Sequence, residues 1–239
     1  MKILVLESSG LVASVAVVTE EKLIGEYTTN FKKTHSQTLL PMMDTLLKMI
    51  GIPVQEMDAI AVSGGPGSFT GLRIGSATAK GLGLALSIPI ISVPTVDAIA
   101  YNYNLCGTDA VVCPLMDARR NQTYTGLYTF DGDQMKCISG QKAVMLGEII
   151  DEINQLGRKV IFLGDGVPVF KPYIEEHIQV PHSYAPIHLS QQRAGALGAL
   201  ALQYYHEGKY ESAAEHQPDY LRLSQAEREL AAKKGQEKA

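Results

Sequence analysis

The stretch that most constrains the fold of this chain runs from Ala59 to Val93 and reads AIAVSGGPGSFTGLRIGSATAKGLGLALSIPIISV. Its first four apolar residues end in a cluster of glycines and a proline, which neither a helix nor a central strand accommodates. The segment Leu72–Leu86 is typical of a helix, and the β-branched run Ile88–Val93 is typical of a second buried strand. We therefore predict a parallel crossover unit made of a strand, a glycine loop, a helix and a strand.

The loop at the centre of this unit allows three interpretations. Its N–H groups at the start of a helix could bind an anion or nucleotide, with Gly65 and Gly67 of the loop and Glu7 and Ser9 of the first turn as candidate residues. Alternatively, the glycines make a tight turn, or they let a second backbone approach closely. Both nucleotide fingerprints are absent, because no Lys-Ser or Lys-Thr follows the glycines and Thr70 stands where a dinucleotide loop needs its third glycine.

Two helices offer more packing surface than one sheet needs. The predicted helix Ser36–Ile50 ends before Gly51, a residue typical of a left-handed cap, and its apolar residues cover a wide arc. The helix Leu72–Leu86 carries Arg73 and Lys80 on one narrow stripe and small residues at spacings of four on another side. Each interior glycine costs about 1 kcal/mol relative to alanine, which close packing must offset. The residues that we expect at a partner interface are Leu39, Met42, Met43, Leu46, Leu47, Ile50, Gly75, Ala79 and Gly83.

The order of the predicted elements indicates two similar lobes. Three strands precede the first helix, which is typical of a mixed sheet with an opening meander. An acidic residue at a hairpin and a later strand that ends in a glycine turn occur first with Glu7 and again with Asp117 and Gly164–Gly166. We predict an α/β fold of two lobes, each a mixed sheet flanked by helices, over residues 1–104 and 105–222. A charged tail, 223–239, follows, and we expect the helix 191–207 to be able to pack back on the first lobe.

Composition and motif spacing exclude several functional classes. The chain has 239 residues, is 46% hydrophobic and carries a formal net charge of −4, which argues against a protein that holds nucleic acid by itself. The three cysteines form no CxxC pair, and no two of the six histidines are three or four residues apart, so the sequence indicates neither a disulfide framework nor a helical metal site. No apolar run has the length of a signal peptide or membrane span, so we expect a cytoplasmic protein.

The segment Gly65–Gly75, GPGSFTGLRIG, resembles the hallmark of the TsaB (YeaZ) family. Other similar stretches are Ile3–Val17, His35–Gln37 with Leu39–Pro41, Asp117–Arg119 with Tyr124, and Pro218–Arg222. The resemblance implies an actin-like, ribonuclease H-like fold. It also implies a non-catalytic scaffold that supports TsaD, a homologous metal-binding transferase, when a threonylcarbamoyl group moves to N6 of an adenosine beside the tRNA anticodon.

The resemblance also implies the partners. These are a TsaD-like transferase subunit, and a TsaE-like ATPase and tRNA that are reached only through the complex. We expect no association with a membrane. Whether the isolated chain forms a homodimer is left open. We expect no catalytic residue, no metal and no cofactor, with at most weak ATP binding.

The two helices are expected to form a four-helix bundle with the equivalent helices of TsaD. The alternative is that the two lobes of a single chain bury both helices. Two other functions stay open. An actin-like nucleotide-dependent enzyme fits the fold, whereas a metallopeptidase fits only the glycoprotease name attached to such sequences.

Overall fold

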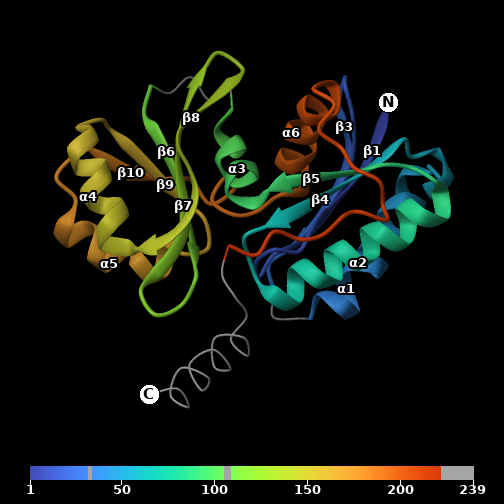
Figure 1. Ribbon diagram of the computed structural model, residues 1–239, viewed down its shortest axis with the longest axis horizontal. Helices are drawn as coiled ribbons and strands as arrows, with labels where there is room; N and C mark the ends of the chain where they lie inside the picture. Colours follow the sequence, from blue (N-terminus) through green and yellow to red (C-terminus); the bar gives the residue numbers. More distant parts are fainter. Residues whose placement is uncertain (32–33, 105–108, 222–239) are drawn as a thin grey trace, which may run out of the picture.

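The computed structural model describes residues 1–31, 34–104 and 109–221, which form two five-stranded sheets that lie beside one another (Figure 1). The predicted tail 223–239 lies outside the described residues. The predicted boundary between residues 104 and 105 adjoins the undescribed segment 105–108, so the division into two domains at that point stays a prediction.

The first sheet has the strand order β3-β2-β1-β4-β5. Strand β1 pairs antiparallel with β2, where Leu4 faces Val17, and parallel with β4, where Leu6 faces Val62. The central strands are buried on both faces because helices cover both sides of the sheet. The strands are β1 (Lys2–Glu7), β2 (Ala13–Thr19), β3 (Leu23–Thr29), β4 (Ala59–Gly65) and β5 (Ile90–Pro94).

The second sheet repeats this arrangement. Its strand order is β10-β9-β6-β7-β8, which is the order of the first sheet read backwards with every strand number raised by five. Strand β6 again pairs antiparallel with the next strand of the chain and parallel with β9. The predicted mixed sheets and their duplicated order are therefore confirmed. The strands are β6 (Val111–Asp117), β7 (Gln122–Asp131), β8 (Gln134–Met145), β9 (Val160–Leu163) and β10 (His182–Tyr184).

Alternate residues of a strand point to opposite faces of the sheet, and different helices cover the two faces. In β1, Leu4 and Leu6 face α1 and α2, whereas Ile3 and Val5 face α6 on the opposite side. The second sheet packs against α4 and α5 on one face and against α3 on the other. The helices are α1 (His35–Ile50), α2 (Phe69–Leu86), α3 (Thr95–Ala100), α4 (Leu146–Leu156), α5 (Val167–His177) and α6 (Ala194–His206), with single 3₁₀ turns at Val54–Glu56 and Tyr101–Tyr103. Gly51 caps α1 with a φ of 68°, as predicted.

The two lobes exchange their last helices. Helix α3 follows the first sheet but packs on β6 and β7, and α6 follows the second sheet but packs on β1 and β2. Helix α6 begins at Ala194 rather than at the predicted Gln191; the residues before it form a turn and a bend, and the Nδ2 of Asn102 donates to the carbonyl oxygens of Leu189 and Gln191 there. The exchange joins the lobes through two helices.

Candidate functional site

The glycine loop after β4 and the start of α2 pack directly on the first turn of the chain. A Cβ at Gly67 would collide with the carbonyl oxygen of Ser9, and a Cβ at Gly71 would collide with that of Ser8. Gly75, one helical turn further on, faces the Oγ of Ser8 in the same way. Of the three interpretations of these glycines, the structure therefore supports the close approach of two backbones.

Hydrogen bonds fasten the same contact. The N–H of Ser68 donates to the carbonyl oxygen of Ser9 at 2.6 Å, and the Oγ of Ser68 caps α2 by accepting from the N–H of Gly71. Gly65 has a φ of 115°, and a Cβ there would collide with the carbonyl oxygen of Asp219. The candidate residues Gly65 and Gly67 thus face carbonyl oxygens, and anion or nucleotide binding by this loop stays a prediction.

Glu7 is buried at the end of β1, in the turn that the glycine loop covers. Its Oε1 accepts hydrogen bonds from the N–H of Ser9 at 2.7 Å and from the Oγ of Ser9 at 2.6 Å. Burial raises the pKa of Glu7 to about 7 because the charged carboxylate loses its hydration; the hydrogen bonds from Ser9 and Ser63 lower the pKa in part, and the nearby charge of Asp165 makes a smaller upward contribution. Glu7 and Ser9 therefore form a compact buried pair.

A cleft of about 460 Å³ separates the two lobes at this turn. Asp165, which follows β9 in the second lobe, lies mostly buried at the cleft, and burial together with the charge of Asp117 raises its pKa to about 6. The first lobe contributes the first turn and the glycine loop. The residues that line the cleft are Ser9, Gly10, Leu11, Pro66, Gly67, Ser68, Phe69, Thr70, Leu72, Met116, Asp117, Ala118, Arg119, Tyr124, Asp165, Asp219, Tyr220 and Leu221.

The second lobe contributes to the rim of the cleft a turn in which three consecutive non-glycine residues have left-handed backbone conformations. Arg119, Arg120 and Asn121 have φ angles of 67°, 56° and 58°, and each left-handed non-glycine residue costs about 1 kcal/mol or more. Asp117 holds this turn by accepting from the N–H of Arg119 at 2.8 Å and from its Nη1 at 3.1 Å. The guanidinium of Arg119 is thus directed at Asp117, within its own turn.

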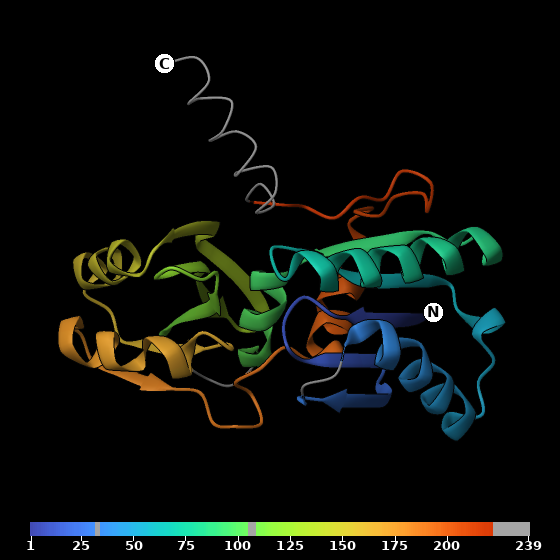
Figure 2. The same ribbon diagram turned by 90° about the horizontal axis from the view of Figure 1, so that it is seen from below.

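Helices α1 and α2 lie side by side on one face of the first sheet (Figure 2). Most of the residues that we expected at a partner interface are core residues instead. Gly75 packs on Ser8 and Val62, Ala79 has no exposed surface, and a Cβ at Gly83 would lie 2.8 Å from Ala213. The α1 residues Leu39, Met42, Met43, Leu46 and Leu47 are buried in the core cluster under the sheet, and Ile50 packs at its margin.

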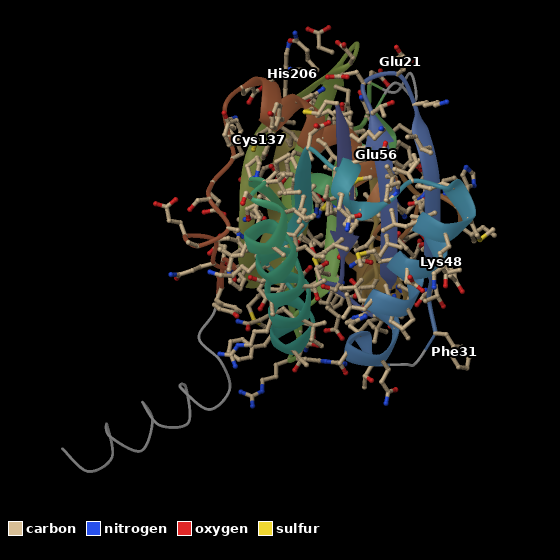
Figure 3. The ribbon with its side chains drawn as sticks, turned by 90° about the vertical axis from the view of Figure 1, so that its right-hand side faces the viewer. Glu21, Phe31, Lys48, Glu56, Cys137 and His206 are labelled. Atoms are coloured by element: carbon tan, nitrogen blue, oxygen red, sulfur yellow. The ribbon has the colours of Figure 1, made fainter. Side chains whose placement is uncertain are left out.

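The chain itself covers the small-residue row, and the partner interface expected at these positions stays a prediction. The opposite face of the helix pair is the one that is exposed. On α2 it carries Leu84, with 60% of its surface exposed; on α1, Leu40 and Met49 are 50% and 81% exposed but lie nine residues apart, on opposite flanks of the buried side of that helix. Ala77 and Gly81 of α2 lie on the same exposed side, and a Cβ at Gly81 would meet no atom within 4 Å. Figure 3 shows the two helices together, with Lys48 and Phe31 on the side of α1 away from α2.

A segment after α6, 210–221, covers the end of the row at Gly83, where Ala213 packs, and was missing from the sequence prediction. It pairs with β5 through the N–H and C=O groups of Ile90 and Glu211, and the Nζ of Lys80 donates to the carbonyl oxygens of Ala214 and His216 at 2.9 and 2.7 Å. Near its end the rings of Tyr220 and Phe69 lie 4.7 Å apart. We call 210–221 the strap. In the sequence, only the end of this segment, from Pro218 onward, stood out, as one of the stretches that resemble the TsaB family.

The duplicated sheets, the exchanged helices and the cleft between the lobes define a protein of the two-lobed, actin-like class. A solved inorganic polyphosphate/ATP-glucomannokinase from Arthrobacter, 12% identical, matches with a TM-score of 0.50 over 86% of this chain and 99% of that chain, a likeness in fold alone. The predicted fold class is therefore confirmed.

The chain belongs to the TsaB family of tRNA threonylcarbamoyladenosine biosynthesis proteins. It is 34% identical to TsaB of Bacillus subtilis over 95% of this chain and 96% of that protein. A Pseudomonas aeruginosa structure described as similar to the peptidase YEAZ is 27% identical, with a TM-score of 0.79 over 92% of this chain and 99% of that chain. The family model "TsaD: tRNA N6-adenosine threonylcarbamoyltransferase" matches residues 22–230. The family named from the glycine segment is therefore confirmed.

Proposed function

We propose that this chain is a non-catalytic accessory subunit that supports a TsaD-like transferase in the threonylcarbamoylation of tRNA. The observation that carries the proposal is the exposed outer side of two adjacent helices, where α2 presents Leu84 in solvent beside a row of small residues and α1 exposes Leu40 and Met49 on its two flanks. Full burial of one such side chain contributes about 1.5–3 kcal/mol, so three of them supply a substantial part of an association energy. The family membership supports the reaction and the identity of the partner.

The geometry of α2 also favours helix pairing on this face. Ala77, Gly81 and Ala85 follow one another at spacings of four and are all exposed. Small residues in such a row let a second helix approach closely, while Leu84 beside them fills space between the helices. We infer a four-helix contact that uses this face in place of the buried row of Gly75, Ala79 and Gly83.

The same proposal includes the other partners. A TsaE-like ATPase and tRNA would reach this chain only through the assembled complex, in the cytoplasm, and the isolated chain would use the same face for a homodimer. In the described part of the chain no helix is long and apolar enough to cross a membrane.

Gly81→Arg tests the interface. The site is open, so the variant is expected to fold and even to gain about 0.5–1 kcal/mol of helix stability, yet it places a long cation in the small-residue row. Val169→Arg is the matched control, because Val169 is an exposed apolar residue on α5 of the other lobe. We expect Gly81→Arg to weaken binding of the TsaD-like subunit at least a hundredfold and to abolish tRNA modification, and Val169→Arg to change neither. Unchanged affinity in a folded Gly81→Arg variant would refute the interface.

A further inference from the structure

Strand β3 forms an open edge of the first sheet. It pairs with β2 alone, and the register between the two strands is continuous from Gly25 to Thr29. In an antiparallel ladder only alternate residues of an edge strand bond to the neighbouring strand, so the N–H and C=O groups of the others point away from the sheet. Within the described parts of the chain, residues 25–29 make no backbone hydrogen bond outside the ladder with β2. This edge therefore presents backbone donors and acceptors to a further strand.

The other three sheet edges are protected in ways that β3 is not. Strand β10 has only three residues, β8 carries Lys136 and Lys142, and β5 is covered by the strap. The one charged residue of β3 is Glu26, and its carboxylate is occupied by the Nη2 of Arg193 at 2.6 Å and by the N–H of Gly195 at 2.9 Å. Both of these partners lie at the start of α6, so this charge does not guard the edge.

A groove of about 360 Å³ runs between β3 and α1. Tyr27 and Phe31 border it on the side of the strand, with 43% and 71% of their surface exposed, and Pro41 borders it on α1. Met42, which is buried, lies at the base of the groove. No charged side chain is among the described residues that line it. The groove therefore fits an uncharged, apolar side chain.

The strap shows how this sheet receives an extended segment at an edge beside a helix. The backbones of Ile90 and Glu211 exchange two hydrogen bonds, each 2.9 Å long. Two residues further on, Ala213 enters the core between β5 and α2, where it lies 2.8 Å from the position of a Cβ at Gly83. Helices α1 and α2 cover the same face of the sheet, so β3 with α1 is the counterpart of β5 with α2 at the opposite edge. Among the described residues, no segment takes the place of the strap there.

We propose that the groove between β3 and α1 is a docking site for an extended segment of a partner protein. The backbone of that segment adds to the edge 25–29 as a further strand, and one uncharged, apolar side chain enters the groove, as Ala213 does at the other edge. The main-chain hydrogen bonds supply affinity, and the groove selects the side chain.

This site is separate from the proposed helix interface. None of the residues that line the groove belongs to α2, and Figure 3 shows Phe31 projecting outward on the side of α1 away from α2. The small-residue row of Ala77, Gly81 and Ala85 is thus free to bind its own partner at the same time. The docking site does not rest on the proposed function.

A phage-displayed library of random linear peptides, selected on the immobilised full chain, supplies the probe. Thr45→Arg serves for depletion, because Thr45 is exposed on α1 and lines the groove, and arginine favours a helix more than threonine does. We expect the selected peptides to share one large apolar residue within an extended pattern. A selection that enriches no such peptide would overturn the proposal.

Binding of the synthetic form of the selected peptide, measured by fluorescence anisotropy, locates the site. We expect Thr45→Arg to weaken binding at least about tenfold, because the apolar side chain would then meet a charge. Ser36→Arg, which places the same side chain on α1 outside the groove, should bind as the wild type does, and so should Gly81→Arg on the helix interface. Equal binding by Thr45→Arg and the wild type, or loss of binding in Gly81→Arg, would contradict the groove as the site.

N-methylated peptides on the wild-type chain test strand addition and do not depend on the folding of any variant. Methylation of a peptide N–H that pairs with β3 removes one hydrogen bond, so we expect affinity to fall about fivefold to tenfold at every second position only. Hydrogen exchange should show added protection at alternate amides of residues 25–29. Equal tolerance of methylation at all positions, or unchanged exchange in 25–29, would refute strand addition.

Sedimentation equilibrium without peptide distinguishes a partner segment from a second copy of the chain. We expect Thr45→Arg and the wild type to have the same oligomeric state. A wild-type dimer that Thr45→Arg converts to a monomer would assign the groove to a second copy and overturn the proposal. Loss of the transferase subunit by Gly81→Arg, or its retention, decides the proposed function separately.

Discussion

Ser8 donates a hydrogen bond through its Oγ to the carbonyl oxygen of Gly71 at 2.9 Å, and this bond fastens the first turn of the chain to the first turn of α2. The backbone of Ser8 also occupies the place where a side chain at Gly71 would begin. The glycine at this position is thus required by a neighbour that lies far away in the sequence.

The same substitution at two glycines of α2 should therefore have opposite effects. We expect Gly71→Ala to cost about 3 kcal/mol, because the new Cβ collides with backbone that cannot easily move. Gly81→Ala should instead stabilise the fold by about 0.5–1 kcal/mol, since its Cβ enters open space and alanine favours the helix. Urea unfolding of the two variants and the wild type measures both changes. Equal effects would show that the packing on Ser8 is not what sets the cost.

Lys80 should control the strap. Lys80→Met removes the ammonium group that holds the carbonyl oxygens of Ala214 and His216, and we expect a loss of about 2 kcal/mol and faster proteolytic cleavage within 210–221. Lys48→Met is the matched control, because Lys48 forms only an exposed pair with Asp44 and should lose less than about 0.5 kcal/mol. Limited proteolysis with mass-spectrometric mapping of the cuts is the measurement, and equal cleavage of both variants would contradict the role of Lys80.

Asp97 of α3 links the lobes through two tyrosines, and Tyr128→Phe should weaken this link. The hydroxyl of Tyr128 donates to Asp97 at 2.6 Å in a largely buried site, and that of Tyr204 on α6 donates at 3.4 Å. Burial already raises the pKa of Asp97, and loss of a donor to its charged form should raise the pKa further and cost about 1–3 kcal/mol. Tyr184→Phe, whose hydroxyl meets the exposed Glu175, should cost much less in thermal unfolding.

The stability of the fold should depend on the protonation of Glu7. Because the pKa of Glu7 is raised from 4.5 to about 7, the native state binds the proton more tightly than the unfolded chain. Its contribution is complete below pH 4.5 and is lost as the pH rises through about 7, a difference of about 3 kcal/mol. Urea unfolding at pH 4.5 and 7.5 should show this decrease in the wild type and a smaller one in Glu7→Gln. An identical decrease in both proteins would assign it to other groups.

ATP should bind weakly or not at all, and no peptide should be hydrolysed. The candidate loop residues Gly65 and Gly67 face carbonyl oxygens, which repel phosphate, and the nucleotide fingerprints are absent from the sequence. Isothermal calorimetry with Mg-ATP and a chelator-controlled peptidase assay check both expectations. Micromolar affinity for ATP, or peptidase activity that a chelator removes, would contradict them.

Much of the fold and the family could be predicted from local pattern. The glycine cluster after β4, the helix behind it and the buried strand β5 follow from residue types within one stretch, because turns, capping and hydrophobic periodicity act over a few residues. The repeat of an acid at a hairpin and a later glycine turn was sufficient to predict two similar lobes. The acids Glu7 and Asp117 were recognised for the same reason.

The exposed face of α2 could not be predicted in this way. Helix α2 contains three glycines whose surroundings differ. Gly75 meets Ser8 and Gly83 meets Ala213, whereas Gly81 meets open space. A row of small residues indicates that something comes close, but it does not say whether a partner or the chain itself does so. The strap and the first turn, far from α2 in the sequence, decide it, because burial depends on contacts between segments that only the folded chain brings together. The exchange of α3 and α6 between the lobes was decided in the same way.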